Sequence, residues 1–174
     1  MRKLNFNSAI LAAAAVFAIA ALLFYLLFSP GNTVLVLADC DTGNVYTCFD
    51  VSDGDEFSIA FIHSVNKSEV REYYTIYSDE IYLEKCLYSD FGAGVATEIE
   101  DGQSLSYTED GKMLISNIHM RIDKLSYIVG TVSDHILYIN GKEISLRALC
   151  GKNSPVEFNV KKVGRFFIWR NSYE

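Results

Sequence analysis

The sequence of 174 residues lacks the motifs that would assign it a reaction or a cofactor. It has no CxxC pair, so neither a zinc knuckle nor a thioredoxin-type redox centre is expected. It has no GxGxxG and no Walker-type phosphate loop. The three histidines (His63, His119 and His135) lack the short spacing of a metal-binding helix, and residues 50–56 would put apolar side chains at ligand positions of a calcium loop. We therefore predict a non-enzymatic protein with no catalytic residues, no cofactor and no metal site.

Positive charge is scarce, and acidic residues are missing from the first part of the chain. The first acidic residue is Asp39, and all 22 Asp and Glu follow residue 28. Of the 15 Lys and Arg, 13 also follow residue 28, so this part carries a net charge of −9. A strongly acidic balance of this kind argues against nucleic acid and against anionic lipid surfaces as partners.

Residues 9–28 form a long, mostly apolar segment of 20 residues without any charge. A helix of that length spans roughly 30 Å, the thickness of a bilayer hydrocarbon core. Arg2 and Lys3 precede it, and positive charge stays on the cytoplasmic side. We expect a single-pass protein of the cell membrane with a cytoplasmic N-terminus (1–8), a transmembrane anchor (9–28), a short linker (29–33) and an extracytoplasmic domain (34–174).

Two alternatives to an uncleaved anchor are open. A signal peptidase site at Ala18-Ile19-Ala20 would release the domain, although the apolar run continues through residues 22–28. A lipid anchor on Cys40 is less favoured, because Asp39 stands where a small residue is expected. The four cysteines, at positions 40, 48, 86 and 150, form two disulfides in one interpretation and remain partly buried thiols in the other.

Alternating apolar and polar residues dominate the chain after the linker and predict short strands separated by turns. The strongest hairpin signal is Asn140-Gly141. The fold class expected is all-β, as a compact antiparallel sandwich or barrel. The predicted strands are 34–37, 45–49, 57–63, 70–77, 81–88, 113–118, 135–139, 142–146, 156–163 and 166–169.

A candidate polar site comprises His63, Ser64, Arg71 and Glu72. If Val65 and Val70 close a hairpin, His63 faces Glu72 and Ser64 faces Arg71, with Phe61 and Tyr74 on the face of the first pair. The His63–Glu72 pair then serves as an acid–base pair, as part of a ligand pocket, or simply as support for the hairpin. His63 and Ser64 point to opposite faces of a strand, so they do not form a nucleophile–base couple.

A candidate loop, Gly92-Ala93-Gly94, is the second distinctive segment. Its glycines permit positive φ or close backbone approach, as in a β-bulge or in a loop that contacts a ligand. Five tyrosines between residues 73 and 88 either belong to the core or stack on a ligand.

Together these segments resemble the family known as domain of unknown function 1850. The residues that carry the resemblance are His63-Ser64-Val65, Glu72-Tyr73, Gly92-Ala93-Gly94, Val129-Gly130, Asp134-His135 and residues 141–146. The likeness extends over about residues 34–163, with Ala96 standing where the family often has proline.

The resemblance implies a context and no chemical activity. Family members are often encoded beside ion-driven TRAP transporters of the subclass with TAXI solute-binding proteins. It therefore implies an accessory protein that contacts the membrane subunit or the solute-binding protein of such a transporter. The alternative is a stand-alone anchored domain that binds a ligand or acts as a sensor; an extracytoplasmic hydrolase is a remote third.

Overall fold

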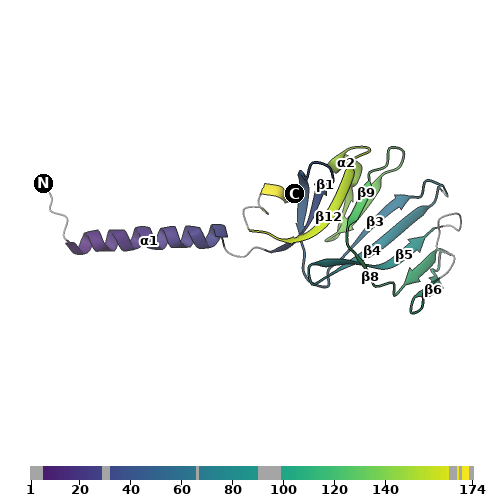
Figure 1. Cartoon of the computed structure of the whole chain (residues 1–174), viewed down its shortest axis with the longest axis horizontal. Helices are drawn as coiled ribbons and strands as arrows, with labels where there is room; N and C mark the ends of the chain where they lie inside the picture. The colour runs from purple at the N-terminus through teal and green to yellow at the C-terminus, as the bar shows by residue number, and fades with distance from the viewer. Residues whose placement is uncertain are drawn as a thin grey trace.

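The computed structural model describes residues 6–28, 32–65, 67–89, 99–164, 168 and 170–172. Helix α1 (Phe6–Phe28) precedes a domain built mostly of β-strands, and Figure 1 shows it apart from the sheets. Side chains of α1 are described for residues 10–25, where the large apolar ones are exposed. No helix within the described residues is long and apolar enough to cross a membrane.

The domain consists of two antiparallel sheets arranged as a sandwich (Figure 1). The smaller sheet has the order β2-β1-β12-β9 and the larger one β11-β10-β3-β4-β5-β7-β6, with β8 paired to β5. The strands of the smaller sheet are β1 (Thr33–Asp39), β2 (Val45–Asp50), β9 (Leu125–Ile128) and β12 (Pro155–Lys162). Those of the larger sheet are β3 (Glu56–Ile62), β4 (Glu69–Tyr77), β5 (Glu80–Tyr88), β6 (Ser104–Tyr107), β7 (Met113–Ser116), β8 (Met120–Ile122), β10 (His135–Ile139) and β11 (Lys142–Ser145).

Two tight hairpins follow directly from local sequence. Ser78 and Asp79 connect β4 to β5 with φ of 51° and 66°, and Asn140 and Gly141 connect β10 to β11 with φ of 50° and 72°. Positive φ at both central residues is the turn geometry that matches the right-handed twist of paired strands. Asn and Gly adopt it at low cost, which explains why the second hairpin is readable from the sequence.

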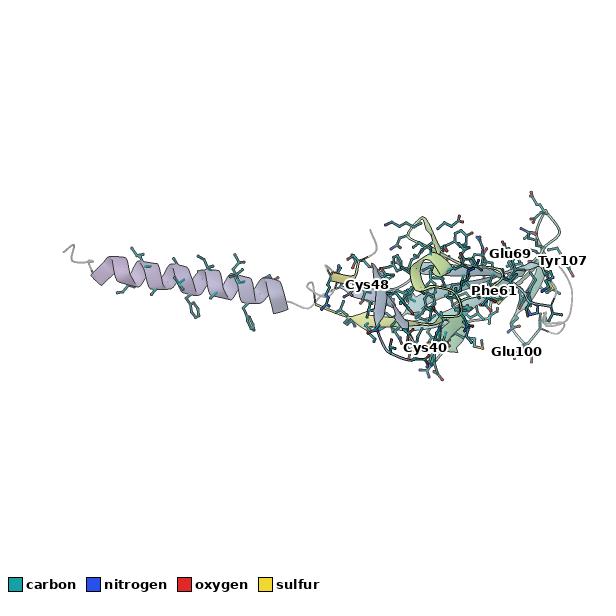
Figure 2. All side chains as sticks on the ribbon, turned by 90° about the horizontal axis from the view of Figure 1, so that it is seen from above. Cys40, Cys48, Phe61, Glu69, Glu100 and Tyr107 are labelled. Atoms are coloured by element: carbon teal, nitrogen blue, oxygen red, sulfur yellow. The ribbon has the colours of Figure 1, made fainter. Side chains whose placement is uncertain are left out.

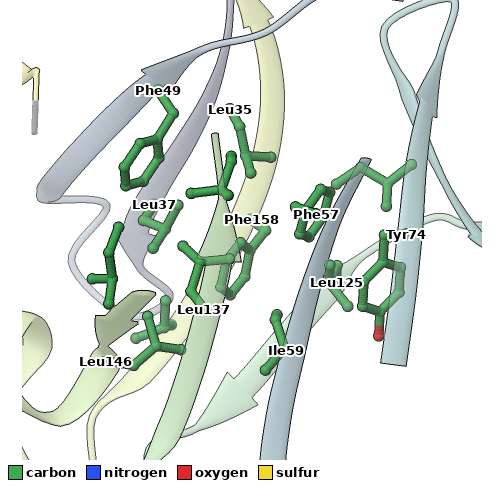
Figure 3. Packing of buried hydrophobic residues seen from close by; sticks show 14 of the residues in the cluster. Leu35, Leu37, Phe49, Phe57, Ile59, Tyr74, Leu125, Leu137, Leu146 and Phe158 are labelled. Atoms are coloured by element: carbon green, nitrogen blue, oxygen red, sulfur yellow. The ribbon is translucent and has the colours of Figure 1, made fainter. Parts of the chain in front are cut away.

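The core lies between the two sheets. Figure 3 shows Phe57 of β3 between Phe158 of β12 and Tyr74 of β4, with ring centroids 6.2 and 5.1 Å away. Leu35 and Leu137 are fully buried beside them. Each fully buried side chain of this size contributes about 1.5–3 kcal/mol, so the inner faces of both sheets hold the sandwich together.

The expectation of antiparallel β structure is confirmed, and the arrangement is sandwich-like. Strands β6, β8 and β9 were not predicted, because they have only three or four residues and mostly exposed side chains. The strand predicted over 142–146 ends at Ser145, which caps the short helix α2 (Leu146–Cys150). Of the strand predicted over 166–169 only Ile168 is described, and it lies in a helical turn because its N–H donates to the Gly164 carbonyl.

Candidate functional site

The predicted polar site lies on the β3–β4 hairpin, and the register of the two strands differs from the prediction. Ile59 faces Glu72 and Ala60 faces Arg71, so the predicted pairing of His63 with Glu72 and of Ser64 with Arg71 is wrong by four residues. The pairing continues beyond β3, because the His63 N–H donates to the Ser68 carbonyl at 2.9 Å. The chain therefore reverses before Ser68, earlier than the turn assumed at residues 66–69.

A shift of four residues leaves every side chain on its expected face. Because the side-chain period is two, Phe61, Glu72 and Tyr74 still share the face that looks toward the smaller sheet. Arg71 lies on the opposite face, where its guanidinium carbon stands 4.0 Å from the ring centroid of Tyr138. The structure therefore separates Arg71 from Glu72 instead of joining them in one site.

Glu72 belongs to a cluster with two tyrosines. Its Oε2 accepts hydrogen bonds from the Tyr74 hydroxyl at 3.0 Å and from the Tyr127 hydroxyl. The two hydroxyl oxygens are themselves 2.6 Å apart. Tyr127 comes from β9 of the smaller sheet, so this cluster joins the two sheets across the interior.

The electrostatics of this cluster favour a structural role. Burial, reinforced by the charge of Glu72, raises the pKa of Tyr74 and of Tyr127, and the contact with Tyr74 raises the pKa of Tyr127 further. Both phenols therefore stay protonated near neutral pH and serve as hydrogen-bond donors. They donate to a carboxyl group that is partly buried between the sheets, where hydrogen bonds replace the contacts with water that burial removes.

Next to this cluster lies a cleft with a volume of about 380 Å³. Residues of two loops line it, one after β3 with His63, Ser64 and Lys67, the other before β10 with residues 130–133. Phe61 and His135 contribute two stacked rings, with centroids 5.2 Å apart. Figure 2 shows Cys48 at the end of the domain nearest α1 and Phe61 well away from it, so the cleft lies toward the far part of the domain.

The loop over residues 130–133 is held by Gly130 and Arg147. The Gly130 N–H donates to Nδ1 of His135 at 3.2 Å, and Arg147 Nη2 donates to the Gly130 carbonyl at 3.0 Å. A Cβ atom at position 130 would stand 2.2 Å from the Ser133 carbonyl oxygen, which only glycine avoids. The wall of the cleft therefore depends on a backbone approach that no other residue permits.

Asp134 anchors the same loop to α2. Its carboxylate accepts from the Ser145 hydroxyl at 2.5 Å, from the Arg147 N–H at 2.9 Å and from the His135 N–H at 2.7 Å. Burial raises the pKa of Asp134, but these hydrogen bonds outweigh it and hold the pKa below its usual value. His135 has the opposite balance, because burial lowers the pKa of its imidazole in spite of the neighbouring carboxylate.

A second cleft, of about 260 Å³, lies at another edge of the sandwich and contains Asp79, Glu80, Arg121 and Asp123. Its charges are paired: Arg121 bonds Glu80 and Asp123 at 2.7 Å each, and Asp79 bonds Lys162 at 2.5 Å. A cleft whose charged side chains are already engaged in ion pairs offers less to a charged ligand than the one beside Phe61.

The remaining candidates from the sequence are the loop over residues 92–94 and the four cysteines. Gly92, Ala93 and Gly94 lie outside the described residues. Among the residues that are described, no group of His, Cys, Asp or Glu is arranged to hold a metal ion. The four cysteines are free thiols in the structure, in agreement with the buried-thiol alternative, and burial raises the pKa of Cys86 and Cys150 to about 12.

His63 and Ser64, which the sequence predicted as site residues, line the cleft, but most of the other lining residues were not predicted. Asp134, His135 and Gly130 entered only through the family resemblance, and Tyr127 was not singled out. A signal was present in the segment 129–135, where a glycine, two hydroxyl residues, an aspartate and a histidine occur together. Such a loop between two strands is typical of binding sites on a rigid β scaffold.

Comparison with known proteins supports the resemblance. The family model described as Domain of unknown function (DUF1850) matches residues 57–146, just over half of the chain and narrower than the expected 34–163. This range contains the lining residues of the cleft, Glu72 and Tyr127, but leaves out β1, β2 and β12. No curated protein and no solved structure matches. The chain belongs to the family named Domain of unknown function (DUF1850).

Proposed function

We propose that this protein is a non-enzymatic binding protein, anchored in the cell membrane by residues 9–28 with its β domain outside the cytoplasm. The observation that carries the proposal is the cleft beside Phe61 and His135, a concave site with both apolar and polar lining on a rigid sandwich. Its volume is at the lower end of the range for small-molecule sites. The tyrosines nearest to it are fully protonated donors near neutral pH, which suits binding better than acid–base chemistry.

The anchor is supported by the sequence, in which the uncharged run covers all of residues 9–28. Among the described side chains of α1, Leu11, Phe17 and Phe24 are exposed by 70, 77 and 65% on a helix that is apolar all round. A helix of that kind is stable only where apolar material covers it, either lipid or protein.

The topology is tested by protease digestion of intact cells, or of spheroplasts where an outer membrane is present. We expect the β domain to be removed, while residues 1 to about 30 stay protected by the cytoplasm and the membrane. A mature chain that begins near Ala21, seen by mass spectrometry, would show that the segment is a cleaved signal peptide.

The partner that we propose is a TAXI-type TRAP uptake transporter, contacted at its membrane subunit or its solute-binding protein. Support comes from family membership, because the resemblance implies genes beside such transporters. The test is co-purification from mildly solubilised membranes. The matched control joins residues 1–33 of this chain to an unrelated domain. Equal recovery of transporter subunits with both proteins would contradict the proposed partner.

A stand-alone anchored ligand-binding or sensory domain is the second candidate, and the cleft itself favours it. A binding site that lies away from α1 is open to solutes without any transporter (Figure 2). The two candidates separate in one pair of measurements. Ligand binding by the isolated full-length chain, together with absence of co-purification, supports the stand-alone domain, while enrichment of transporter subunits supports the accessory protein.

A further inference from the structure

From the charges and rings around the cleft beside Phe61 and His135, we infer that it binds a small organic anion, with a planar group of the ligand on the two rings and its anionic group near Lys67. The inference rests on the proposed binding function and adds the chemical class of the ligand.

The lining of the cleft is unlike the rest of the domain in charge. The chain after residue 28 carries a net charge of −9, yet none of the described residues that line this cleft is an Asp or a Glu. Lys67 does line it, and among the ion pairs of the described residues none involves Lys67. Asp134 is the acid next to the cleft in sequence, and three donors from the protein already surround its carboxylate. Glu72 of the neighbouring cluster likewise already accepts from two tyrosine hydroxyls. Lys67 is therefore the formally charged side chain that the described lining offers to a ligand, and it favours an anion.

The hydrogen-bonding groups of the lining also favour an acceptor-rich ligand. Nδ1 of His135 accepts the Gly130 N–H, so the proton of the neutral ring is on Nε2, which makes that nitrogen a donor. The lowered pKa of His135 keeps the ring in this neutral form near pH 7. Ser64, Thr131 and Ser133 add hydroxyl groups to the lining, and hydroxyls donate readily to a carboxylate.

The two rings form a preorganised platform. Phe61 and His135 are stacked with an angle of 21° between their planes, and Tyr127 packs against both, at centroid distances of 6.0 and 5.5 Å. Tyr127 is in turn held by its hydrogen bond to Glu72. Ile62 and Val132 add apolar lining that is 40 and 92% exposed. A planar apolar group would cover these surfaces, while its anionic end reaches the polar groups.

The experiment titrates the full-length chain in detergent micelles with benzoate, followed by saturation-transfer NMR. Three further probes separate the parts of the inference: benzamide keeps the ring without the charge, acetate keeps the charge without the ring, and inorganic phosphate stands for a lipid headgroup. We expect benzoate to bind at least about fivefold more tightly than each of the other probes. For benzamide, this is the factor that one surface charge pair provides.

The variant Lys67→Gln removes the charge and keeps a polar side chain that is only one atom shorter. We expect it to weaken benzoate binding about fivefold and to leave benzamide binding unchanged. The matched control is Lys152→Gln, an exposed lysine in the turn after α2. Circular dichroism confirms that both variants are folded.

Several outcomes would overturn the inference. Equal binding of benzoate and benzamide would show that the anionic group of the ligand is not recognised. Equal binding of benzoate and acetate would show that the two rings do not contribute to binding. Tighter binding of phosphate than of benzoate would show that the site prefers ligands that resemble a lipid headgroup. Absence of binding by all four probes would refute the site as described. None of these results alters the co-purification or protease results, so failure here remains distinguishable from failure of the proposed function.

Discussion

The Glu72 cluster makes a sharp prediction for the variant Tyr127→Phe. The change removes a single hydroxyl and leaves the ring that packs against Phe61 and His135. Among the described residues, Oε2 of Glu72 then keeps the Tyr74 hydroxyl as its remaining hydrogen-bond donor, although Glu72 is still partly buried between the sheets. We expect the domain to lose stability because a partly buried carboxyl group has lost one of its hydrogen bonds.

The magnitude follows from the kind of bond that is lost. A hydrogen bond to a charged group contributes about 1.5–3 kcal/mol, so Tyr127→Phe should lower the free energy of unfolding by about 2 kcal/mol. With a denaturant slope of about 2 kcal/mol per molar urea, the unfolding midpoint should fall by about 1 M. The assay is urea unfolding of the full-length chain in non-ionic detergent micelles, followed by near-ultraviolet circular dichroism.

The matched control is Tyr73→Phe, the same substitution one residue from Tyr74 on the opposite face of β4. We expect it to change the midpoint by much less than Tyr127→Phe. The double variant Tyr74→Phe/Tyr127→Phe should be non-additive, because both hydroxyls share Oε2 of Glu72 and contact each other. Equal midpoints for Tyr127→Phe and Tyr73→Phe would refute the role assigned to the cluster.

Three further predictions concern the loop that forms the cleft wall. Gly130→Ala should lower the free energy of unfolding by about 1–3 kcal/mol and weaken benzoate binding, because the new Cβ would stand 2.2 Å from the Ser133 carbonyl oxygen. An unchanged melting temperature would contradict that close approach. Ser145→Ala should lower the free energy of unfolding by about 0.5–2 kcal/mol, measured by thermal unfolding, because it removes the N-cap of α2 and a hydrogen-bond donor to Asp134. The control Ser126→Ala, at an exposed position of β9, should leave the free energy of unfolding nearly unchanged. His135→Gln should reduce the loss of stability that the domain shows as the pH falls below about 6.5. The pKa of His135 is lowered in the folded state, so the unfolded chain binds the proton at a higher pH than the folded domain does. Stability is therefore lost as the pH falls from the unfolded pKa through the folded pKa, and the variant lacks this contribution. Melting curves of both proteins across this pH range decide it, and parallel pH profiles would show that His135 does not contribute.

Local sequence determined much of the strand pattern. The turn residues Asn140 and Gly141 adopt the positive φ that a two-residue hairpin requires, whatever the rest of the fold. The alternation in residues 57–62 determined which side chains of β3 face the smaller sheet, because the side-chain period of a strand is two. The uncharged run at 9–28 similarly predicts α1 by itself, since it contains neither a charge nor a helix breaker.

Only the tertiary structure decided which residues meet. Alternation specifies a face but not a register, so pairings of Glu72 with His63 and with Ile59 satisfy the same pattern, and the backbone bond from His63 to Ser68 selects the second. Tyr127 reaches Glu72 because β9 lies in the other sheet, beside β12, an arrangement that no local signal encodes. Phe61 and His135 come together because β10 pairs with β3 across more than 70 residues of sequence. The cleft is therefore a product of sheet order and sandwich packing, which depend on burying both apolar faces at once.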